Sequence, residues 1–444
     1  MEIKRNILKK MEEWKDRKER RPLILHGARQ IGKTWAIMKF GELHFKYTAY
    51  FNFDSNLDLR VEFQRTKDAG RLIQILGLYC DVPIIAKETL IVFDEIQECP
   101  EALNSLKYFC EDTPSYHIVA AGSLLGVALH KGNGFPVGKV DFLEMYPVSF
   151  DEYFRVYNRK YGEIIDTFRD KKDFLSMPEI LKTTLDEGFR HYRVCGGMPK
   201  VAVASLERKG NDRIEVEQNE LLSSFFRDFS KHAPLNDFPR IALVWNSLPS
   251  QLAKENRKFI YKVVKPGARA REFEAALNWL REAGLIYQIF CCTKPGLPLS
   301  AYDDVSAFKI YMLDCGLLRA LAKMPAELYL VTKPEFSEFK GALMENVVLQ
   351  QLLASSWPMP RYWVSNGTAE VDFILQDGLD IIPFEIKSGN NVASKSLAVY
   401  IQKYNPGKAV IISENELSIK PGETTIFKIP ASLLPWGLRL LKED

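Results

Sequence analysis

A glycine-rich loop near the N-terminus combines the residue types that hold a phosphate chain. It lies between an apolar strand expected over residues 22–25 and a helix that opens at Lys33. The loop consists of Gly27, Ala28, Arg29, Gln30, Ile31, Gly32, Lys33 and Thr34. Its glycines let the backbone curl so that successive N–H groups face one phosphate chain, Lys33 can reach the β and γ phosphates, and the Thr34 hydroxyl can bind Mg²⁺. The loop, with contacts extending to Trp35, therefore predicts that the chain binds ATP and Mg²⁺.

An acidic pair follows the next strongly apolar segment. Residues 89–97 contain four consecutive apolar residues that end in Asp94 and Glu95. A strand buried in a parallel sheet would leave both carboxylates at its C-terminal edge, beside the phosphate loop, where open α/β sheets bind their ligands. Asp94 can then hold Mg²⁺ and its water shell, while Glu95 polarises the attacking water. The second carboxylate favours ATP hydrolysis over transfer to a substrate hydroxyl, the reaction of small-molecule kinases.

Polar residues end two further strand-like segments. Residues 117–123 end in Ser123, whose hydroxyl would lie near the γ phosphate; the alternative is an ordinary serine at a strand-to-turn junction. Asn52 lies at the end of the segment 48–53 and could hydrogen-bond Glu95, holding it inactive until a partner binds. Asparagine also favours such positions for local reasons, so both interpretations of Asn52 stay open.

Charged residues with a second characteristic spacing lie near the C-terminus. Asp372 falls in one expected strand, and Glu385 and Lys387 fall in the next, over residues 381–388. Side chains two apart in a strand share one face, so Glu385 and Lys387 point the same way. The two carboxylates and the carbonyl of Ile386 are hard oxygen ligands for Mg²⁺, and Lys387 could orient or deprotonate a water that attacks a phosphodiester.

This pattern resembles that of the PD-(D/E)XK nucleases. A helix expected over residues 338–353 carries Glu345, which could complete the metal shell, and Glu370 could also approach the ion. The resemblance implies an α/β nuclease-like fold in which the three charged residues of the two strands are catalytic. A Glu-x-Lys pair also occurs as a surface ion pair, and metal ligands can persist in a DNA-binding domain without cleavage, so nuclease activity is a separate question.

The N-terminal motifs resemble those of the AAA-type ATPases, in particular a bacterial and archaeal family whose ATPase precedes a C-terminal domain without assigned function. The resemblance covers the whole chain and implies a P-loop AAA-type three-layer core. In that family the segment that corresponds to residues 138–150 usually carries a Gly-Arg pair, whose arginine could stabilise the charge of the transition state. Here the position is Lys139, a point charge without the bidentate fork of arginine. The matching segments are residues 27–34, 93–97, 121–123 and 138–150.

Two further regions separate these motifs. Residues 151–234 are helix-rich, with a break at 195–199, and could form a lid that closes over the nucleotide. From residue 238 onward a helix, a short segment, a second helix and a strand follow in the order of a winged helix. Its basic residues would suit double-stranded DNA, although winged helices also serve as protein-interaction modules and nearby glutamates dilute the basic face. These basic residues are Lys258, Lys262, Lys265, Arg269, Arg271 and Arg281.

Composition limits the remaining function classes. The chain has 444 residues, 46% hydrophobic and 26% charged, which is enough for several domains with their own cores. A formal net charge of +3 is too small to indicate nucleic-acid binding by itself. Seven cysteines without C-x-x-C spacing indicate a reducing compartment, and six scattered histidines argue against a zinc site. No apolar run approaches the roughly 18 residues of a membrane span, and the charged N-terminus differs from a signal peptide. We therefore expect a cytoplasmic protein without a membrane partner.

The expected fold class is α/β, organised as four domains. An AAA-type ATPase domain covers residues 1–150, a helical connector or lid 151–235, a winged helix 236–335 and a PD-(D/E)XK nuclease-like domain 336–444. We expect an ATP hydrolase that couples its nucleotide state to the winged helix and the nuclease-like domain on DNA. The alternative is a regulatory ATP switch without nuclease activity that binds a protein partner. The expected catalytic residues are Lys33, Glu95, Asp372, Glu385 and Lys387, and the expected metal ligands are Thr34, Asp94, Glu345, Asp372 and Glu385.

Overall fold

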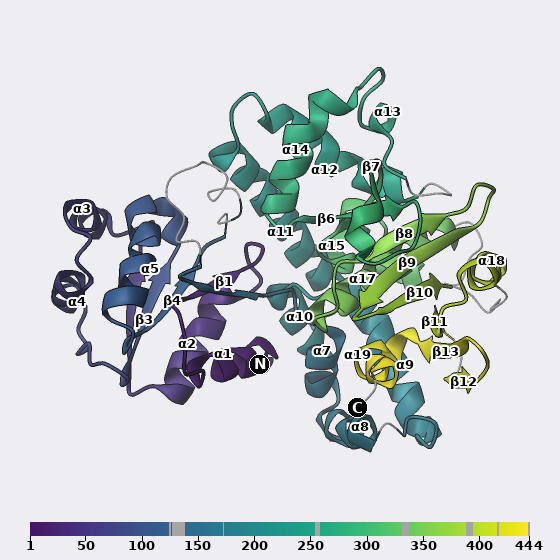
Figure 1. Ribbon diagram of the computed structural model, residues 1–444, viewed down its shortest axis with the longest axis horizontal. Helices are drawn as coiled ribbons and strands as arrows, with labels where there is room; N and C mark the ends of the chain where they lie inside the picture. Colours follow the sequence, from purple (N-terminus) through teal and green to yellow (C-terminus); the bar gives the residue numbers. More distant parts are fainter. Residues whose placement is uncertain are drawn as a thin grey trace. The chain divides into compact units, whose positions relative to one another are not determined.

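The chain forms two compact units, each built around a β-sheet (Figure 1). The N-terminal unit comprises Lys4–Tyr146 and Trp279–Leu285, and the C-terminal unit comprises Met1–Ile3, Pro147–Asn278 and Ile286–Asp444. The computed structural model describes residues 1–123, 126, 138–171, 173–253, 258–330, 337–387, 394–414 and 417–442. Residues 279–285, which the sequence pattern assigns to the winged helix, thus belong to the N-terminal unit.

The N-terminal unit has a five-stranded parallel sheet in the order β2-β3-β4-β1-β5. Strand β3 is buried along its whole length, as expected for a parallel strand covered on both faces. The first four strands occupy the segments predicted from the apolar runs, so the α/β prediction is confirmed for this unit. The strands are β1 (Leu23–His26), β2 (Tyr47–Asn52), β3 (Thr89–Asp94), β4 (His117–Ala121) and β5 (Asp141–Glu144).

Helices lie on both faces of this sheet and give the unit three layers (Figure 1). Helices α1 and α2 pack on one face, and α3, α4 and α5 cover the other. Alternate strand residues point into the second of these layers. Phe93 on β3, for example, contacts Phe63 on α3 and Phe109 on α5, with ring centroids 5.7 and 5.9 Å apart. The helices are α1 (Ile7–Lys15), α2 (Lys33–His44), α3 (Leu57–Arg65), α4 (Ala69–Leu78), the 3₁₀ helix η1 (Ile96–Glu98) and α5 (Pro100–Asp112).

The C-terminal unit has a mixed eight-stranded sheet in the order β12-β13-β11-β10-β9-β8-β6-β7. Strand β10 runs parallel to β11 and antiparallel to β9, and β6 runs parallel to β8. The strand expected in the wing, β6, therefore continues the sheet that carries the nuclease-like motif. Gly378, with a φ of 60°, allows the tight turn between β9 and β10. The strands are β6 (Ile286–Cys292), β7 (Asp303–Met312), β8 (Arg361–Val364), β9 (Glu370–Asp377), β10 (Asp380–Ile386), β11 (Lys408–Ser413), β12 (Ser418–Lys420) and β13 (Thr425–Pro430).

Some helices of the C-terminal unit precede this sheet in the chain, and others lie between its strands or follow its last strand. One of them, α14 (Ala270–Glu282), ends in the N-terminal unit, which includes its residues from Trp279 on. Helices α12, α13 and α14 precede β6 in the order expected for a winged helix, an assignment that stays a prediction. In the described ranges, no helix combines the length and the apolar character needed to cross a membrane. The helices are α7 (Phe150–Tyr157), α8 (Arg159–Lys171), α9 (Glu179–Cys195), α10 (Pro199–Leu206), α11 (Asn211–His232), α12 (Phe238–Leu252), α13 (Tyr261–Val264), α14 (Ala270–Glu282), η2 (Leu299–Tyr302), α15 (Cys315–Leu321), α16 (Ala326–Leu330), α17 (Ser337–Ala354), α18 (Lys395–Tyr404), η4 (Ala431–Leu433), α19 (Leu434–Gly437) and η5 (Leu438–Leu441).

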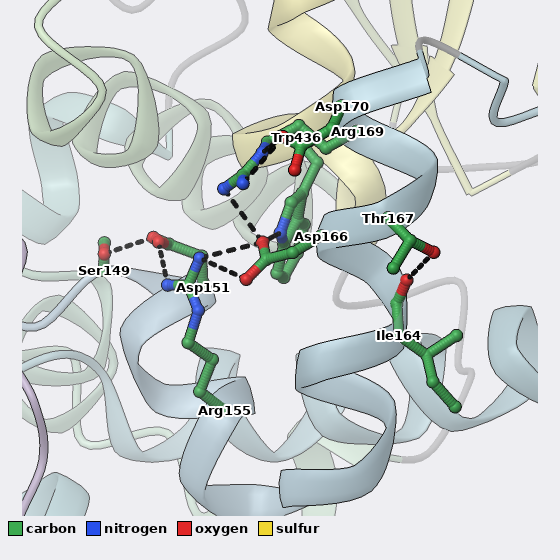
Figure 2. A network of polar contacts seen from close by, with 9 residues as sticks. All are labelled: Ser149, Asp151, Arg155, Ile164, Asp166, Thr167, Arg169, Asp170 and Trp436. Atoms are coloured by element: carbon green, nitrogen blue, oxygen red, sulfur yellow. Dashed lines mark hydrogen bonds and ion pairs between the residues drawn. The ribbon is translucent and has the colours of Figure 1, made fainter.

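A network of polar side chains joins the first helices of the C-terminal unit to its last (Figure 2). Asp166 on α8 accepts hydrogen bonds from Arg155 on α7 at 3.1 Å and from the indole of Trp436 on α19 at 3.3 Å. Arg169 pairs with the same carboxylate at 2.9 Å. Trp436 is buried and meets Phe150 of α7 edge-on, with ring centroids 5.9 Å apart. The helical segment after the ATPase-like region and the end of the chain therefore fold together.

The glycine pair predicted as a chain break is a fixed junction inside the C-terminal unit. Gly196 has a φ of 74°, and a Cβ added there would lie 2.2 Å from an oxygen of Asp314. The buried Asp314 carboxylate accepts hydrogen bonds from the N–H of Gly197 at 2.5 Å and from that of Leu317 at 2.9 Å. Since a buried carboxylate requires such donors, the segment before α10 is tied to the first turn of α15.

Candidate functional site

The glycine-rich loop connects β1 to α2 and has the backbone conformation that its glycines predict. Gly27 and Gly32 have φ values of 145° and 92°, and Gln30 also adopts a positive φ of 65°. A Cβ added to Gly27 would lie 2.3 Å from the carbonyl oxygen of Met145, so only glycine fits there. The loop therefore ends at the first turn of a helix, where backbone N–H groups and the helix dipole favour an anion.

The side chain of Lys33 folds back into the loop. Its Nζ donates hydrogen bonds to the carbonyl oxygens of Gly27 at 2.8 Å and Ala28 at 2.7 Å, and the residue is 7% exposed. Burial lowers the pKa of Lys33 to about 8, while the carboxylates of Glu95 and Asp94 oppose this shift. The ammonium is thus held by two neutral acceptors, which a phosphate group can replace at a gain in electrostatic attraction.

The end of β3 lies beside the start of α2. The Thr34 hydroxyl and the Tyr50 hydroxyl both donate to Asp94 Oδ2, each at 2.7 Å, and Asp94 Oδ1 accepts the N–H of Glu95 at 3.0 Å. A hydroxyl and a carboxylate in contact, with Asp94 only 5% exposed, fit Mg²⁺, which prefers hard oxygen ligands. The sequence reasoning missed Tyr50, although its position two residues before Asn52 on β2 places it on the same face of that strand.

Glu95 is held by residues that follow β3 and β4. Its backbone is left-handed, with φ 49° and ψ 44°, and its Oε2 accepts hydrogen bonds from Gln97 Nε2 at 2.6 Å and from Ser123 Oγ at 3.1 Å. The N–H of Ser123 also points to this oxygen, at 3.4 Å. The structure therefore places Ser123 against the carboxylate expected to activate water.

Of the two interpretations of Asn52, the structure supports the local one and contradicts the hydrogen bond to Glu95. Asn52 Oδ1 accepts the N–H of Asp54 at 2.8 Å, and its Nδ2 lies 3.4 Å from the hydroxyl of Tyr50. The reason is local. The side chain of an asparagine at the end of a strand is long enough to accept the backbone N–H two residues later, so it stabilises the turn that follows the strand.

Two contacts from other parts of the N-terminal unit support the loop. Arg5 donates to the carbonyl of Ile31 at 2.9 Å and to that of Tyr146 at 2.6 Å. Gly284, with a φ of 70°, lies so close to the loop that a Cβ there would be 3.2 Å from the backbone nitrogen of Ala28. No sequence motif indicated either residue, because both come from outside the segments that form the loop.

The remaining predicted residues of this site have varied exposure. Ile31 is fully buried, Ala28 is 4% exposed, and Trp35 is 38% exposed on the first turn of α2. Arg29 is partly exposed and Gln30 is exposed. Lys139, the residue in the position of the expected arginine, pairs with Glu111 on α5 at 2.8 Å.

A second concentration of charge lines a pocket of about 810 Å³ in the C-terminal unit. Asp372 comes from β9, Glu385 from β10 and Glu345 from α17, and Lys387 follows β10, so the structure brings all four predicted residues to one cavity. Lys258, from the segment before α13, lines the same pocket. It reaches the pocket because it forms an isolated antiparallel bridge with Lys309 of β7.

Each predicted carboxylate of this pocket has a partner in the protein. Asp372 Oδ2 accepts the N–H of Ile386 at 2.8 Å, Glu345 Oε2 accepts the Tyr311 hydroxyl at 2.7 Å, and Glu385 Oε1 pairs with Lys387 Nζ at 2.6 Å. Across the part of the chain that the structure describes, no three Asp, Glu, His or Cys side chains are placed to hold one metal ion between them. Asp372 and Glu385 nevertheless line one cavity, and Glu385 Oε2 is buried without a hydrogen-bond partner.

A buried ion pair that the sequence did not reveal lies beside these residues. Lys309 on β7 is fully buried, pairs with Glu370 on β9 and lies 5.0 Å from the ring centroid of Tyr362. Burial lowers the pKa of Lys309, but interactions with Tyr311, Glu370 and Asp372 outweigh burial and raise the pKa overall. A lone lysine in an apolar strand gave no signal, because its partner lies on another strand about sixty residues later in the chain.

The electrostatics of Glu385 reflect this environment. Burial and the neighbouring carboxylate of Asp372 raise the pKa of Glu385, while Lys387 opposes the shift. Two carboxylates in one buried cavity repel each other, so a cation that enters between them relieves the repulsion.

Comparison with protein families divides the chain into three successive matches. Residues 19–154 match an AAA domain. Residues 186–328 and 340–432 match two domains of unknown function, DUF8612 and DUF4143. No curated protein matches the chain. With the loop geometry above, the first match identifies an AAA-type P-loop ATPase domain, in which nucleotide binding is the common property, and neither of the other two matches carries a functional assignment.

Three solved structures are similar to long stretches of the chain. The Walker-type ATPase PABY2304 of Pyrococcus abyssi shares 15% identity, with a TM-score of 0.45, over 72% of this chain and 96% of that chain. The ORC1 protein of Aeropyrum pernix, solved in complex with DNA, shares 11% identity with a TM-score of 0.27 over 74% and 95%. A signal transduction ATPase (STAND protein) with a tetratricopeptide repeat sensor, PH0952 from Pyrococcus horikoshii, shares 13% identity with a TM-score of 0.27 over 80% and 47%.

Proposed function

We propose that the N-terminal unit binds ATP with Mg²⁺ and hydrolyses it. The observation that carries this proposal is the continuous set of contacts at the ends of β1, β3 and β4. Lys33 lies inside the phosphate loop, Thr34 contacts Asp94, and Glu95 follows Asp94 directly and contacts Ser123. Each group required to hold the triphosphate and to accept a proton from water is thus present at one sheet edge.

The roles follow from the chemistry of each side chain. The loop N–H groups and the Lys33 ammonium bind the β and γ phosphates, replacing the carbonyl contacts that Lys33 makes in the free protein. Thr34 and Asp94 would hold Mg²⁺, which neutralises phosphate charge. Glu95 accepts the proton of the water that attacks the γ phosphorus, the bond to the β–γ bridging oxygen breaks, and ADP and phosphate leave.

The test separates binding from turnover. Glu95→Gln should retain ATP binding but lose at least about 100-fold in kcat, because an amide cannot accept the proton. Binding of a fluorescent ATP analogue and release of phosphate are the measurements. Glu88→Gln, which changes an exposed carboxylate of the same unit, is the matched control and should behave as the wild type. Unchanged phosphate release in Glu95→Gln would show that Glu95 is not the base.

We further propose that the C-terminal unit is the output of this ATPase and acts on double-stranded DNA. The supporting observation is that Lys258, one of the basic residues of the predicted winged helix, lines the same pocket as Asp372 and Glu385. Four further basic residues follow on α13, on the segment after it and on the first turn of α14, and all are exposed: Lys262, Lys265, Arg269 and Arg271. A phosphate backbone attracted by these cations would come close to the pocket's carboxylates.

The pocket would act as a nuclease-like site with a bound Mg²⁺. Asp372 and Glu385 Oε2 would hold the ion, which would polarise the scissile phosphate. Lys387, released from Glu385, would orient the attacking water. Glu345 would join the ligands only after losing its contact with Tyr311.

The nuclease proposal is tested by nicking of supercoiled plasmid in Mg²⁺ or Mn²⁺, with and without ATP. Activity that disappears in Asp372→Ala supports the proposal. Asp377→Ala, which removes a partly exposed carboxylate at the end of β9, should cleave as the wild type does. DNA affinity should fall by roughly one log unit per log unit of salt for each phosphate contact. Absence of both cleavage and salt-dependent binding would favour the alternative, an ATP switch whose C-terminal unit binds a protein partner.

A further inference from the structure

We propose that Gln97 restrains ATP hydrolysis by holding Glu95 through a hydrogen bond, an inference that rests on the proposed role of Glu95 as the base. The contact is short, 2.6 Å from Gln97 Nε2 to Glu95 Oε2. Gln97 touches neither phosphate nor metal in the proposed site, so it acts as a positioning residue through Glu95.

The same carboxylate oxygen serves three donors. Besides Gln97, the hydroxyl and the N–H of Ser123 point to Glu95 Oε2 at 3.1 and 3.4 Å. A carboxylate oxygen has about two lone-pair directions, so these donors fill the capacity of Oε2. A water that is to give up its proton must therefore use the other oxygen or displace a donor, and each donor makes the carboxylate a weaker proton acceptor.

Local backbone geometry produces this contact. Glu95 is left-handed, a conformation that non-glycine residues rarely adopt, and the 3₁₀ helix η1 follows at once. The buried side chain of Ile96 anchors that helix in the core of the unit, which leaves the side chains on either side of it to face each other. Such unusual conformations persist where the surrounding structure fixes them, and they cluster at functional sites.

Gln97 itself is incompletely satisfied in this arrangement. Its Oε1 is buried without a hydrogen-bond partner, although the amide as a whole is only partly buried. A buried acceptor without a donor costs free energy, which the bond to Glu95 offsets. Gln97 is therefore held in this arrangement by its bond to Glu95 and by no bond to its own Oε1.

The experiment measures the ATPase rate of the full chain in three variants at position 97. Gln97→Leu nearly keeps the volume of the side chain but removes the donor. We expect kcat to rise about 3- to 10-fold, which corresponds to the net free energy of one hydrogen bond, and ATP affinity to stay unchanged. Gln97→Met also lacks the donor and should raise kcat. Gln97→Lys provides a charged donor that holds the carboxylate more strongly, so kcat should fall below that of the wild type.

Gln64→Leu, at an exposed position on α3, is the control for loss of an amide and should leave kcat unchanged. A fall in kcat in both Gln97→Leu and Gln97→Met, with ATP affinity retained, would overturn the restraint and make Gln97 an activating residue. An unchanged kcat in both variants would also overturn the restraint, because the hydrogen bond to Glu95 would then have no effect on the rate. A failure of the proposed ATPase function would look different. The wild type would then release no phosphate, or Glu95→Gln would release phosphate at the rate of the wild type.

Discussion

The ATP site and the C-terminal pocket both combine carboxylates with lysines, but they hold these charges in different ways. In the ATP site, Lys33 donates to two neutral backbone carbonyls. In the pocket, Lys387 pairs with the carboxylate of Glu385, and Glu370, which also lines the pocket, pairs with the buried Lys309 beside it. A bond to a neutral carbonyl is easily exchanged for one to a phosphate, whereas an ion pair must give up an opposite charge.

This difference shows that the two sites are prepared for their ligands to different degrees. The ATP site offers a cation, a helix N-terminus and a hydroxyl beside a carboxylate, the groups that the proposed Mg²⁺ and triphosphate would need. In the pocket, the carboxylates of Glu385 and Glu370 already pair with lysines of the protein. A divalent cation in the proposed site would have to compete with Lys387 for Glu385, whose Oε2 is buried without a hydrogen-bond partner.

The largest effect is expected from Lys33→Ala, which tests whether the ATP site depends on the buried ammonium inside its loop. Loss of the ammonium should reduce kcat/KM for ATP by about 100- to 1,000-fold, as for other preorganised donors to transferring phosphates. Phosphate release and binding of a fluorescent ATP analogue are the measurements. The control is Lys39→Ala on the same helix, whose lysine pairs with Glu42 at the surface. Equal ATP affinity in Lys33→Ala and the wild type would contradict the comparison.

A smaller effect is expected from Lys309→Met, which tests whether the pocket is neutralised from within. Removing the ammonium leaves Glu370 without its cation, and because that carboxylate is partly exposed we expect a loss of about 2–3 kcal/mol in unfolding free energy. Denaturant unfolding measures it. The double variant Lys309→Met with Glu370→Gln should recover most of the loss, and Lys420→Met at an exposed position serves as control. Equal stability of the single and double variants would show that the pair is not coupled.

The pH dependence of ATP binding tests the charge of Lys33 separately from the charges of the pocket. The pKa of Lys33 is lowered to about 8. The side chain is therefore fully protonated well below this pH, and it loses its proton as the pH rises through 8. A bound phosphate favours the charged form, so binding should take up close to one proton well above pH 8 and progressively less as the pH falls below 8. Calorimetry in buffers of different ionisation enthalpy measures this uptake. Lys33→Arg, which stays charged, should show none at pH 9.

The smallest effect is expected from Tyr50→Phe. The variant removes one of two hydroxyl donors to Asp94 Oδ2 but keeps the ring. We expect the Mg²⁺ concentration for half-maximal ATPase activity to change about 2- to 5-fold, since Thr34 still orients the carboxylate. A titration of the rate with Mg²⁺ checks this. A complete loss of activity would mean that Tyr50 has a more direct part in the reaction than the geometry indicates.

The ATP site could be predicted well because its residues lie in short contiguous motifs. Gly27 and Gly32 require left-handed or otherwise unusual backbone, and Asp94 and Ser123 end apolar strands, so composition and spacing alone locate them. The partners of these residues could not be predicted. Gln97 looked like an ordinary residue after an acidic pair, and the expected partner of Glu95, Asn52, caps its own turn instead.

The C-terminal pocket was less predictable because its chemistry depends on pairs between distant strands. The order of β8, β9 and β10 and the presence of Asp372, Glu385 and Lys387 in one cavity follow from alternation and turn signals. The buried pair of Lys309 with Glu370 joins β7 to β9, and no local pattern marks a lysine whose partner is on another strand.

The sequence by itself determined that this chain carries a phosphate loop, an acidic pair after a buried strand, and a Glu-x-Lys strand near its end. These features are local, because backbone curvature and strand alternation act over a few residues. Only the tertiary structure decided which donor holds Glu95, which cation faces each carboxylate of the pocket, and that residues 279–285 pack in the N-terminal unit. Those contacts depend on how strands and helices far apart in the chain come together, and burial gives each such contact its strength.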